Sequence, residues 1–320
     1  MRLGTRGSPL ALAQAQQVAD LLGDAELVPI RTSGDEPASG GTDRFRTEDD
    51  PAGGDKARFV REIERALLEG EVDLAVHSAK DLPSELPEGL ELAGVPARGD
   101  PRDAYVGDAA SLEDLPGGAR IGTSSLRRRS QLLAVRRDLE VSQIRGNVDT
   151  RLRKLEAGEF DGLVLAAAGL TRLGRGEEIA FEFDTAVLTP AAGQGSLVLE
   201  CRLDDPAEAR AQTITDRHAL ATLACERAAV SALDATCNTP LGVFARLTEG
   251  GRMRVSGYCG LPDGSEWIRD RVEADASDPE SLGAELARRM RGAGAAELLA
   301  RAEEMAAAGA GGADQAGGGA

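Results

Sequence analysis

The sequence predicts an α/β protein with two α/β lobes followed by a small α+β domain. Between Arg2 and Val95, apolar runs of strand length alternate with stretches of helical spacing, and the same alternation begins again after Pro101. Beyond Pro240 the pattern changes to alternating segments separated by turn residues, which is typical of antiparallel hairpins. Two sets of βα units joined by extended crossings predict a ligand cleft between the lobes.

The first lobe is predicted over residues 1–97 and 195–213. Its first strand, Arg2–Arg6, is followed by Ser8-Pro9, a helix cap with proline at the first helical position. Residues 35–54 are rich in Gly, Asp and Pro and have no periodicity, which indicates a mobile surface loop. The remaining elements are a strand at Leu27–Arg31, a helix at Lys56–Leu68, and strands at Val72–Val76, Leu90–Val95 and Ser196–Glu200.

A lysine and an aspartate follow the strand Val72–Val76 almost directly. Lys80 and Asp81 therefore lie just past the carboxyl end of a strand, where open α/β sheets build their sites. An adjacent Lys and Asp more often form a surface ion pair, so the position alone leaves both interpretations open.

The second lobe, over residues 101–190, contains a basic block. Arg120–Lys154 includes ten basic and three acidic residues, a balance of +7 inside a chain of formal net charge −17. Two short strands in this block lead into helix starts, through Gly122–Ser125 and through Gly146-Asn147. Glycine permits the turn and the polar side chain caps the helix, which leaves backbone N–H groups pointed toward an anion.

Four arginines lie at these junctions. A guanidinium can fork two hydrogen bonds onto a carboxylate, so together they predict a site for several anionic groups. The junction arginines are Arg127, Arg128, Arg145 and Arg151. The others in the block are interpreted as a solvated helix face: Arg129, Arg136, Arg137 and Arg153.

The third domain is predicted over residues 216–305. A long helix at Asp216–Leu233 precedes hairpin segments at Gly242–Leu247, Met253–Tyr258 and Glu266–Val272, and one helix over 279–305 closes the domain. The Gly/Ala-rich segment 306–320 is expected to be a disordered tail.

Composition limits the partners. The 54 acidic residues outnumber the 37 basic ones, and aromatic residues make up 3%, so neither nucleic acid nor an anionic membrane is an expected partner. A small anionic ligand is expected instead. No signal peptide or membrane-length apolar run is present, which predicts a cytoplasmic protein. The acidic, lysine-poor composition fits a salt-adapted organism, and compositional drift in an arginine-rich proteome explains it equally.

The cysteines are far apart and include no CxxC pair, so neither a metal site nor a disulfide framework is predicted. Cys201, Cys225 and Cys259 lie within predicted strands or a helix and are interpreted as buried structural thiols. Cys237 lies in a loop beside Pro240, and an arginine-rich cleft facing it would stabilise its thiolate. It is the candidate reactive thiol.

The motifs, in their order, resemble those of the hydroxymethylbilane synthase family, also called porphobilinogen deaminase, over nearly the whole chain. Their combined length, order and spacing are far more specific than any single short motif. The matching segments are TRGSPLALAQ, LAVHSAKDLP, EDLPGGARIGTSSLRRRSQL, IRGNVDTRLRKLEAGEFDGLVLAAAGLTRLG, PAAGQGSLVLECRLDD and CNTPLG.

The resemblance implies two lobes similar to the halves of a periplasmic binding protein, and a small α+β domain that carries a cofactor cysteine. It implies a monomeric transferase that polymerises four porphobilinogen molecules, with loss of ammonia, into 1-hydroxymethylbilane for porphyrin and heme biosynthesis. The product grows on a dipyrromethane cofactor held through a thioether. Cys237 matches the attachment position.

The resemblance also implies roles for individual residues. Asp81 matches the catalytic carboxylate, and an anion there would stabilise the positive charge that develops as ammonia leaves. Arg145 is implied to assist deamination, and no metal is implied. The residues expected to hold cofactor side chains are Lys80, Ser125, Arg127 and Arg128. Those expected to hold the incoming ring and growing chain are Arg6, Ser8, Arg145, Arg151 and Arg172.

Two departures from the family's pattern concern loops. Ala235-Thr236 stands before the cysteine where a Gly pair is usual, and stiffens a loop expected to move. Before the second helix, Ala57 and Arg58 replace a typical Gly and Leu, and Arg61 replaces a second Lys. Neither departure removes a catalytic group.

A bilobal solute-binding protein for a small polycarboxylate is the main alternative. Its two lobes would look the same in sequence, but it predicts no use for Cys237 and no reason for Asp81 to face arginines. Covalent cofactor content separates the two hypotheses.

Overall fold

The computed structural model describes residues 1–30, 55–83, 85–235 and 239–315. The chain divides into two compact units, one formed by Met1–Arg98 and Ser196–Leu220, the other by Gly99–Gly195 and Ala221–Ala320. The predicted loop at 35–54 and Cys237 both lie outside the described residues.

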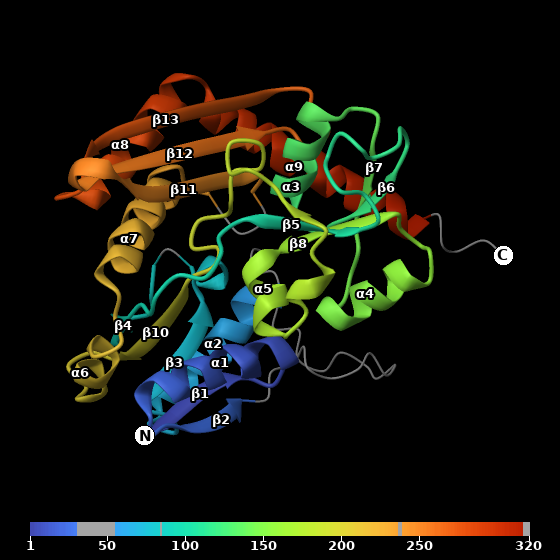
Figure 1. The fold of residues 1–320 in the computed structure, drawn as a ribbon. Coiled ribbons are helices and arrows are strands. Elements are labelled where there is room, and N and C mark those ends of the chain that lie inside the picture. Colours follow the sequence, from blue (N-terminus) through green and yellow to red (C-terminus); the bar gives the residue numbers. More distant parts are fainter. Residues whose placement is uncertain (31–54, 84, 236–238, 316–320) are drawn as a thin grey trace. The chain divides into compact units, whose positions relative to one another are not determined.

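The first unit is built on a mixed five-stranded sheet with the order β2-β1-β3-β10-β4 (Figure 1). β1 is parallel to β2 and β3, whereas β10 is antiparallel to both of its neighbours, β3 and β4. The strands are β1 (Arg2–Arg6), β2 (Glu26–Ile30), β3 (Leu74–Ser78), β4 (Leu90–Gly94) and β10 (Leu197–Arg202).

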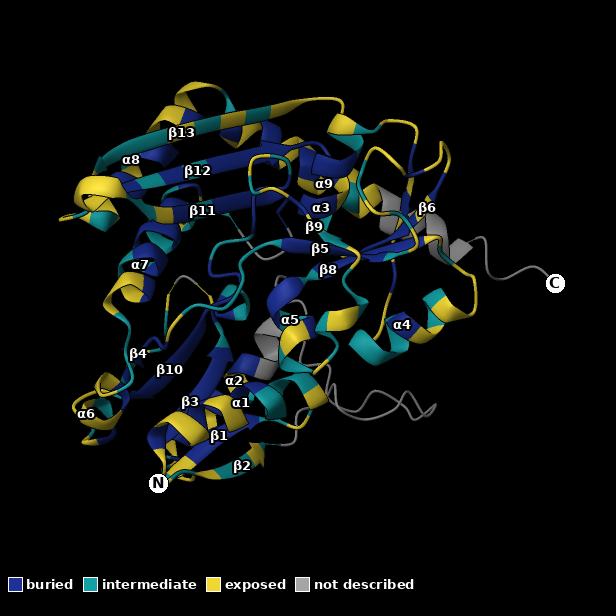
Figure 2. Cartoon of the chain, viewed as in Figure 1, coloured by how far each residue is buried: buried dark blue, intermediate teal, exposed yellow. Residues whose placement is uncertain are grey.

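Helices cover both faces of this sheet, and Figure 2 shows β3 and β10 buried between them. On one face, α1 and α6 pack against Leu3, Leu74 and Leu199. On the other face, Ile63 of α2 packs against Ala75. The helices are α1 (Pro9–Leu22), α2 (Asp55–Leu68) and α6 (Ala207–Gln212), and a 3-10 turn, η1 (Ala79–Asp81), follows β3.

The second unit contains a five-stranded sheet of the same pattern, β7-β6-β8-β5-β9. β6 is parallel to β7 and β8, and β5 is antiparallel to β8 and β9. In each sheet the antiparallel strand is the first one after the chain crosses from the other unit. The predicted class of two interleaved α/β lobes is therefore confirmed. The elements are β5 (Asp103–Gly107), β6 (Arg120–Gly122), β7 (Glu140–Ser142), β8 (Gly162–Ala166), β9 (Phe181–Glu182), α3 (Leu126–Val135), α4 (Val148–Glu156), α5 (Ala167–Arg172) and the 3-10 turn η2 (Gly176–Glu178).

The two crossing segments lie side by side at Gly99 and Gly195. The Gly99 N–H donates to the Gly195 carbonyl oxygen at 3.1 Å. Gly195 has a φ of +87°, and a Cβ there would lie 2.6 Å from the Gly99 carbonyl oxygen. Only glycine fits at this position, because any side chain would clash with the neighbouring backbone.

A three-stranded antiparallel sheet, β11-β12-β13, belongs to the same unit, and α8 and α9 pack on it. The single helix predicted over 279–305 is wrong, because Gly294 adopts a φ of +97° and separates α8 from α9. α9 continues beyond the predicted end at residue 305. The elements are α7 (Arg217–Ala232), β11 (Leu241–Thr248), the 3-10 turn η3 (Glu249–Gly251), β12 (Arg252–Gly260), β13 (Trp267–Asp275), α8 (Pro279–Gly292) and α9 (Ala295–Gln315). Within the described ranges, no helix has both the length and the apolar character needed to cross a membrane.

Candidate functional site

Four of the predicted site residues lie at one edge of the first sheet. β1 and β3 are adjacent and parallel, so their carboxyl ends lie at the same edge. Arg6 ends β1, and the Ser8 hydroxyl caps α1, which confirms the predicted cap. Lys80 and Asp81 lie in η1 directly after β3, and both are half-buried. The topology thus groups these four residues within the first unit.

The corresponding edge of the second sheet carries the basic residues. β6, β7 and β8 are parallel, and their carboxyl ends lead toward α3, α4 and α5. The Ser125 side chain accepts a hydrogen bond from a backbone N–H of α3 at 3.4 Å, and the Asn147 side chain accepts one from α4 at 2.9 Å. Both strand-to-helix junctions predicted from the basic block are therefore confirmed. Arg145 follows β7, and Arg172 ends α5.

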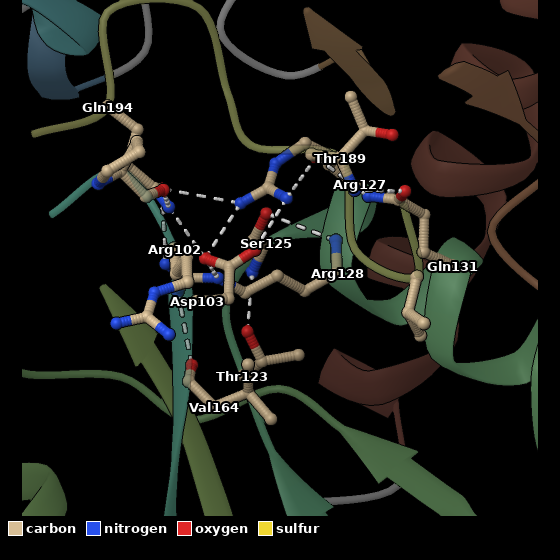
Figure 3. A network of polar contacts seen from close by, with 12 residues as sticks. Arg102, Asp103, Thr123, Ser125, Arg127, Arg128, Gln131, Val164, Thr189 and Gln194 are labelled. Atoms are coloured by element: carbon tan, nitrogen blue, oxygen red, sulfur yellow. Dashed lines mark hydrogen bonds and ion pairs between the residues drawn. The ribbon is translucent and has the colours of Figure 1, made fainter. Parts of the chain in front are cut away.

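Two of the junction arginines converge on a buried carboxylate, as Figure 3 shows. Asp103, the first residue of β5, accepts hydrogen bonds from Arg127 at 2.7 and 3.1 Å and from Arg128 Nε at 2.8 Å. The two arginine side chains are only 4% and 7% exposed, and the aspartate side chain is fully buried. Gln194 donates to the same carboxylate at 2.9 Å, and its carbonyl oxygen accepts from both guanidinium groups at 3.4 and 3.5 Å.

The two guanidinium groups differ in how much of their hydrogen-bonding capacity the protein uses. Arg127 also donates to the Thr189 carbonyl oxygen at 2.7 Å, so four of its five N–H groups have partners. Arg128 uses three, for Asp103, the Val164 carbonyl oxygen and Gln194. Arg128 therefore keeps more N–H capacity for an external anion than Arg127 does.

The network carries excess positive charge. Burial alone would raise the pKa of Asp103, but the charges of Arg127 and Arg128 outweigh it and hold the pKa well below its usual range. Burial lowers the pKa of Arg128, and burial together with the charge of Arg128 lowers the pKa of Arg151. Guanidinium groups remain charged despite such shifts, so Arg127 and Arg128 share one buried carboxylate, and the charge of Arg128 also acts on Arg151. An anionic ligand at this edge of the sheet would balance the surplus positive charge.

The other arginines of the predicted site are less buried than Arg127 and Arg128. Arg151 Nε donates to the Gly146 carbonyl oxygen at 2.9 Å, and Arg145 is exposed. Arg172 Nη2 donates to the Gly195 carbonyl oxygen at 2.7 Å, and burial lowers the pKa of Arg172. Among the arginines interpreted as a solvated helix face, Arg136 is half-buried and pairs with Asp138. The other three are exposed: Arg129, Arg137 and Arg153.

Sequence reasoning missed Asp103 and Gln194. An acidic residue at the head of a buried strand in an arginine-rich lobe is a weak signal for a counter-ion, and the sequence alone gave Asp103 no partner. Gln194 stands between two glycines, which suggests an extended segment and says nothing about its side chain. The attachment of a cofactor to Cys237 remains a prediction, because that residue lies outside the described ranges.

Replacing Asp103 with Asn is expected to destabilise the second unit by about 3–5 kcal/mol, because it leaves two buried guanidinium groups without a counter-ion. The depressed pKa of Asp103 means that its stabilising effect is present above about pH 4 and is lost as the pH falls through the folded-state pKa. Urea unfolding at pH 7 measures the change. Asp138→Asn is the matched control, since that carboxylate also pairs with an arginine but is 48% exposed. An equal loss of unfolding free energy in the two variants would contradict the structural role of Asp103.

Comparison with known proteins identifies relatives over most of the chain. A family model described as porphobilinogen deaminase, dipyromethane cofactor binding domain, matches residues 1–210, and a second, porphobilinogen deaminase, C-terminal domain, matches residues 220–292. Porphobilinogen deaminase of Thermus thermophilus is 45% identical over 307 residues, which cover 93% of this chain and 98% of that protein. The enzyme of that name from Trichlorobacter lovleyi is 43% identical over 309 residues, covering 93% and 95% of the two chains.

Among solved structures, the periplasmic VFT2 domain of Bordetella pertussis BvgS aligns with 66% of this chain and 83% of its own length. The sequence identity is 16% and the TM-score is 0.36. At this level of similarity the alignment carries no functional argument.

Proposed function

This chain belongs to the porphobilinogen deaminase family, and we propose that it joins four porphobilinogen molecules, with loss of ammonia, into 1-hydroxymethylbilane on a covalent dipyrromethane primer. It is a transferase of porphyrin biosynthesis. The solute-binding alternative is not favoured, since the relatives that match over 93% of the chain carry the enzyme's name.

The observation that best supports this function is the surplus of buried positive charge at the edge of the second sheet. Each pyrrole of the substrate carries an acetate and a propionate, so a bound chain of pyrroles presents many carboxylates. The overall charge of −17 would repel such a molecule from most of the surface. Arg127 and Arg128 share one carboxylate, Asp103, and the charge of Arg128 also acts on Arg151, so these arginines suit a ligand that brings its own anionic groups.

The dipyrromethane fits the residues present at this edge. We assign its carboxylates to Arg128 and Arg127, with Ser125 donating its hydroxyl proton while the same oxygen caps α3. Arg127 contributes mainly charge, because four of its N–H groups already have partners. Lys80 of the first unit is proposed as a further cofactor ligand. When bound through Cys237, the cofactor supplies the pyrrole position at which the first substrate ring is added.

The remaining proposed roles concern the incoming ring. Asp81 would hold the pyrrole N–H groups and stabilise the positive charge that develops as ammonia leaves, which is the task for which a carboxylate is suited. Arg145 is exposed and is proposed to assist the deamination. Together with Arg145, the residues proposed to bind substrate and growing chain are Arg6, Ser8, Arg151 and Arg172.

The proposal also includes the domain boundaries, the oligomeric state, the cellular location and the substrate. The domains are taken as residues 1–97 with 195–213, 101–190, and 216–305, with the cofactor cysteine on the last. The protein is proposed to be a monomer in the cytoplasm. Porphobilinogen is its small-molecule substrate.

The intact mass of the purified protein under denaturing conditions tests the proposed function. The mass is expected to exceed that of the polypeptide by two deaminated porphobilinogen units, because the primer is covalent. Incubation with porphobilinogen should release ammonia and 1-hydroxymethylbilane, with the primer mass retained after turnover. A bare polypeptide mass that is unchanged by porphobilinogen, together with reversible binding of a polycarboxylate, would instead support a solute-binding protein.

A further inference from the structure

A polar cluster lies within the apolar layer between α2 and the first sheet. It consists of Glu64 on α2, His77 on β3 and Glu200 on β10, which are 4%, 6% and 0% exposed. β3 and β10 are antiparallel with Val198 opposite His77, so Glu200 is the diagonal neighbour of His77 on the same face. That face is the one on which Ile63 of α2 packs. The described part of the first unit thus encloses three ionisable side chains in its core.

The contacts within this cluster leave two buried carboxylate oxygens without a hydrogen-bond partner. His77 Nε2 lies 2.9 Å from Glu200 Oε2, while Glu200 Oε1 and Glu64 Oε1 are buried without a hydrogen-bond partner. Burial and the charge of Glu200 raise the pKa of Glu64 to about 7, against the opposing charges of His77 and Arg61. Glu64 therefore retains its proton to a higher pH than an exposed glutamate does, beside the hydrogen-bonded pair of Glu200 and His77.

Apolar residues in these places would make a more stable core, because burying three ionisable groups costs free energy. The sheet is also irregular at this point, since the register between β10 and β4 shifts between Leu199 and Glu200. Such bulges are common next to active sites, where they redirect a side chain. Stability alone does not account for the cluster.

The cluster lies beside the turn that carries the proposed catalytic carboxylate. β3 ends at Ser78, one residue after His77, and η1 with Lys80 and Asp81 follows at once. The Ala79 N–H donates to the carbonyl oxygen of Ser196 at 3.1 Å, which ties η1 to the residue before β10. The two strands joined by His77 and Glu200 are therefore the two that hold η1, and α2 also contacts this turn.

We propose that Glu64, His77 and Glu200 are positioning residues, which fix the end of β3 against β10 and α2 and so hold the Asp81 carboxylate in place for the reaction. This inference rests on the proposed role of Asp81. None of the three residues needs to touch the substrate. The charge of Arg61 on α2 also acts on Glu64, and Lys80 and Asp81 lie on η1, which follows β3.

A double-mutant cycle tests whether the cluster acts through Asp81. Glu200→Gln is expected to lower kcat on the order of 10- to 100-fold with a smaller change in KM, because the carboxylate of Asp81 is displaced from the reacting atoms. In an Asp81→Asn background the same change should have almost no further effect. Glu91→Gln is the control, since Glu91 lies near Cys201, which belongs to the core on the opposite face of the sheet. Equal effects of Glu200→Gln in both backgrounds would overturn the inference, whereas an active Asp81→Asn protein would overturn the role of Asp81 itself.

Thermal unfolding of Glu64→Gln provides a readout that does not depend on activity. The folded protein retains the Glu64 proton to a higher pH than the unfolded chain, so wild-type stability should fall between pH 4.5 and about 7 and then level off. The Gln side chain cannot ionise, so the variant should lack this component and have a higher Tm than the wild type at pH 8. Superimposable Tm profiles would show that Glu64 does not titrate in the cluster and would overturn its place in it.

Discussion

Asp81→Asn is expected to lower kcat on the order of 10²- to 10⁴-fold while the protein remains folded and loaded with its primer. The amide has the shape of the carboxylate but no negative charge, so it cannot stabilise the positive charge that develops as ammonia leaves. Asp81 is half-buried in a three-residue turn, so the fold should tolerate the change. Steady-state kinetics with porphobilinogen and the intact mass of the variant measure the two parts of this expectation.

Asp73→Asn is the matched control for that experiment, because Asp73 lies just before β3 and Asp81 lies in the turn just after it. Its carboxylate pairs with Arg2 at 2.5 Å on the surface, and that pairing lowers the pKa of Asp73. Removing an exposed pair costs little stability and should leave kcat unchanged. If both aspartate variants retained full activity, another group would have to stabilise the charge.

The local features of the site could be predicted from sequence because they depend on a few neighbouring residues. A Gly-containing turn followed by Ser or Asn specifies a strand end and a capped helix, and the caps at Ser8, Ser125 and Asn147 are all present. The repeated βα pattern likewise predicted the two α/β lobes, although it missed the short strand β9 at Phe181–Glu182. Their interleaving followed from the extended crossings.

The polar networks could not be predicted, because their partners are distant in sequence. Asp103 and Gln194 are 91 residues apart, and His77 and Glu200 are 123 residues apart. Arg127 had been expected to face a ligand, yet most of its N–H groups bind the protein itself. Residue type indicated where positive charge gathers, whereas only the fold indicates which charges are already balanced. The break at Gly294 was missed because a glycine within a periodic segment does not reveal its φ.

The surroundings of the other cysteines narrow the choice of attachment site. Cys201, Cys225 and Cys259 are fully buried, and burial raises the pKa of each thiol to about 12. At neutral pH such thiols are almost entirely protonated, and the thiolate is the nucleophilic form. None of the three is therefore suited to form a thioether with a pyrrole. By elimination the sequence-based assignment of Cys237 gains support.

Cys237→Ser is accordingly expected to abolish both the covalent primer and the synthesis of 1-hydroxymethylbilane. A serine hydroxyl is a far weaker nucleophile than a thiolate, so the variant should have the bare polypeptide mass even after incubation with porphobilinogen. Cys225→Ala and Cys259→Ala are the controls, and each should keep the primer mass although a buried side chain has been shortened. Denaturing mass spectrometry of the three variants and the wild type shows which cysteine carries the primer. Loss of the primer in either control, or its retention in Cys237→Ser, would place the attachment elsewhere.

Cys237 follows Ala235-Thr236, where a glycine pair is usual. Replacing both residues with glycine should leave the primer mass unchanged, because the thiol is still present, and any change in kcat would then report on the movement of the loop.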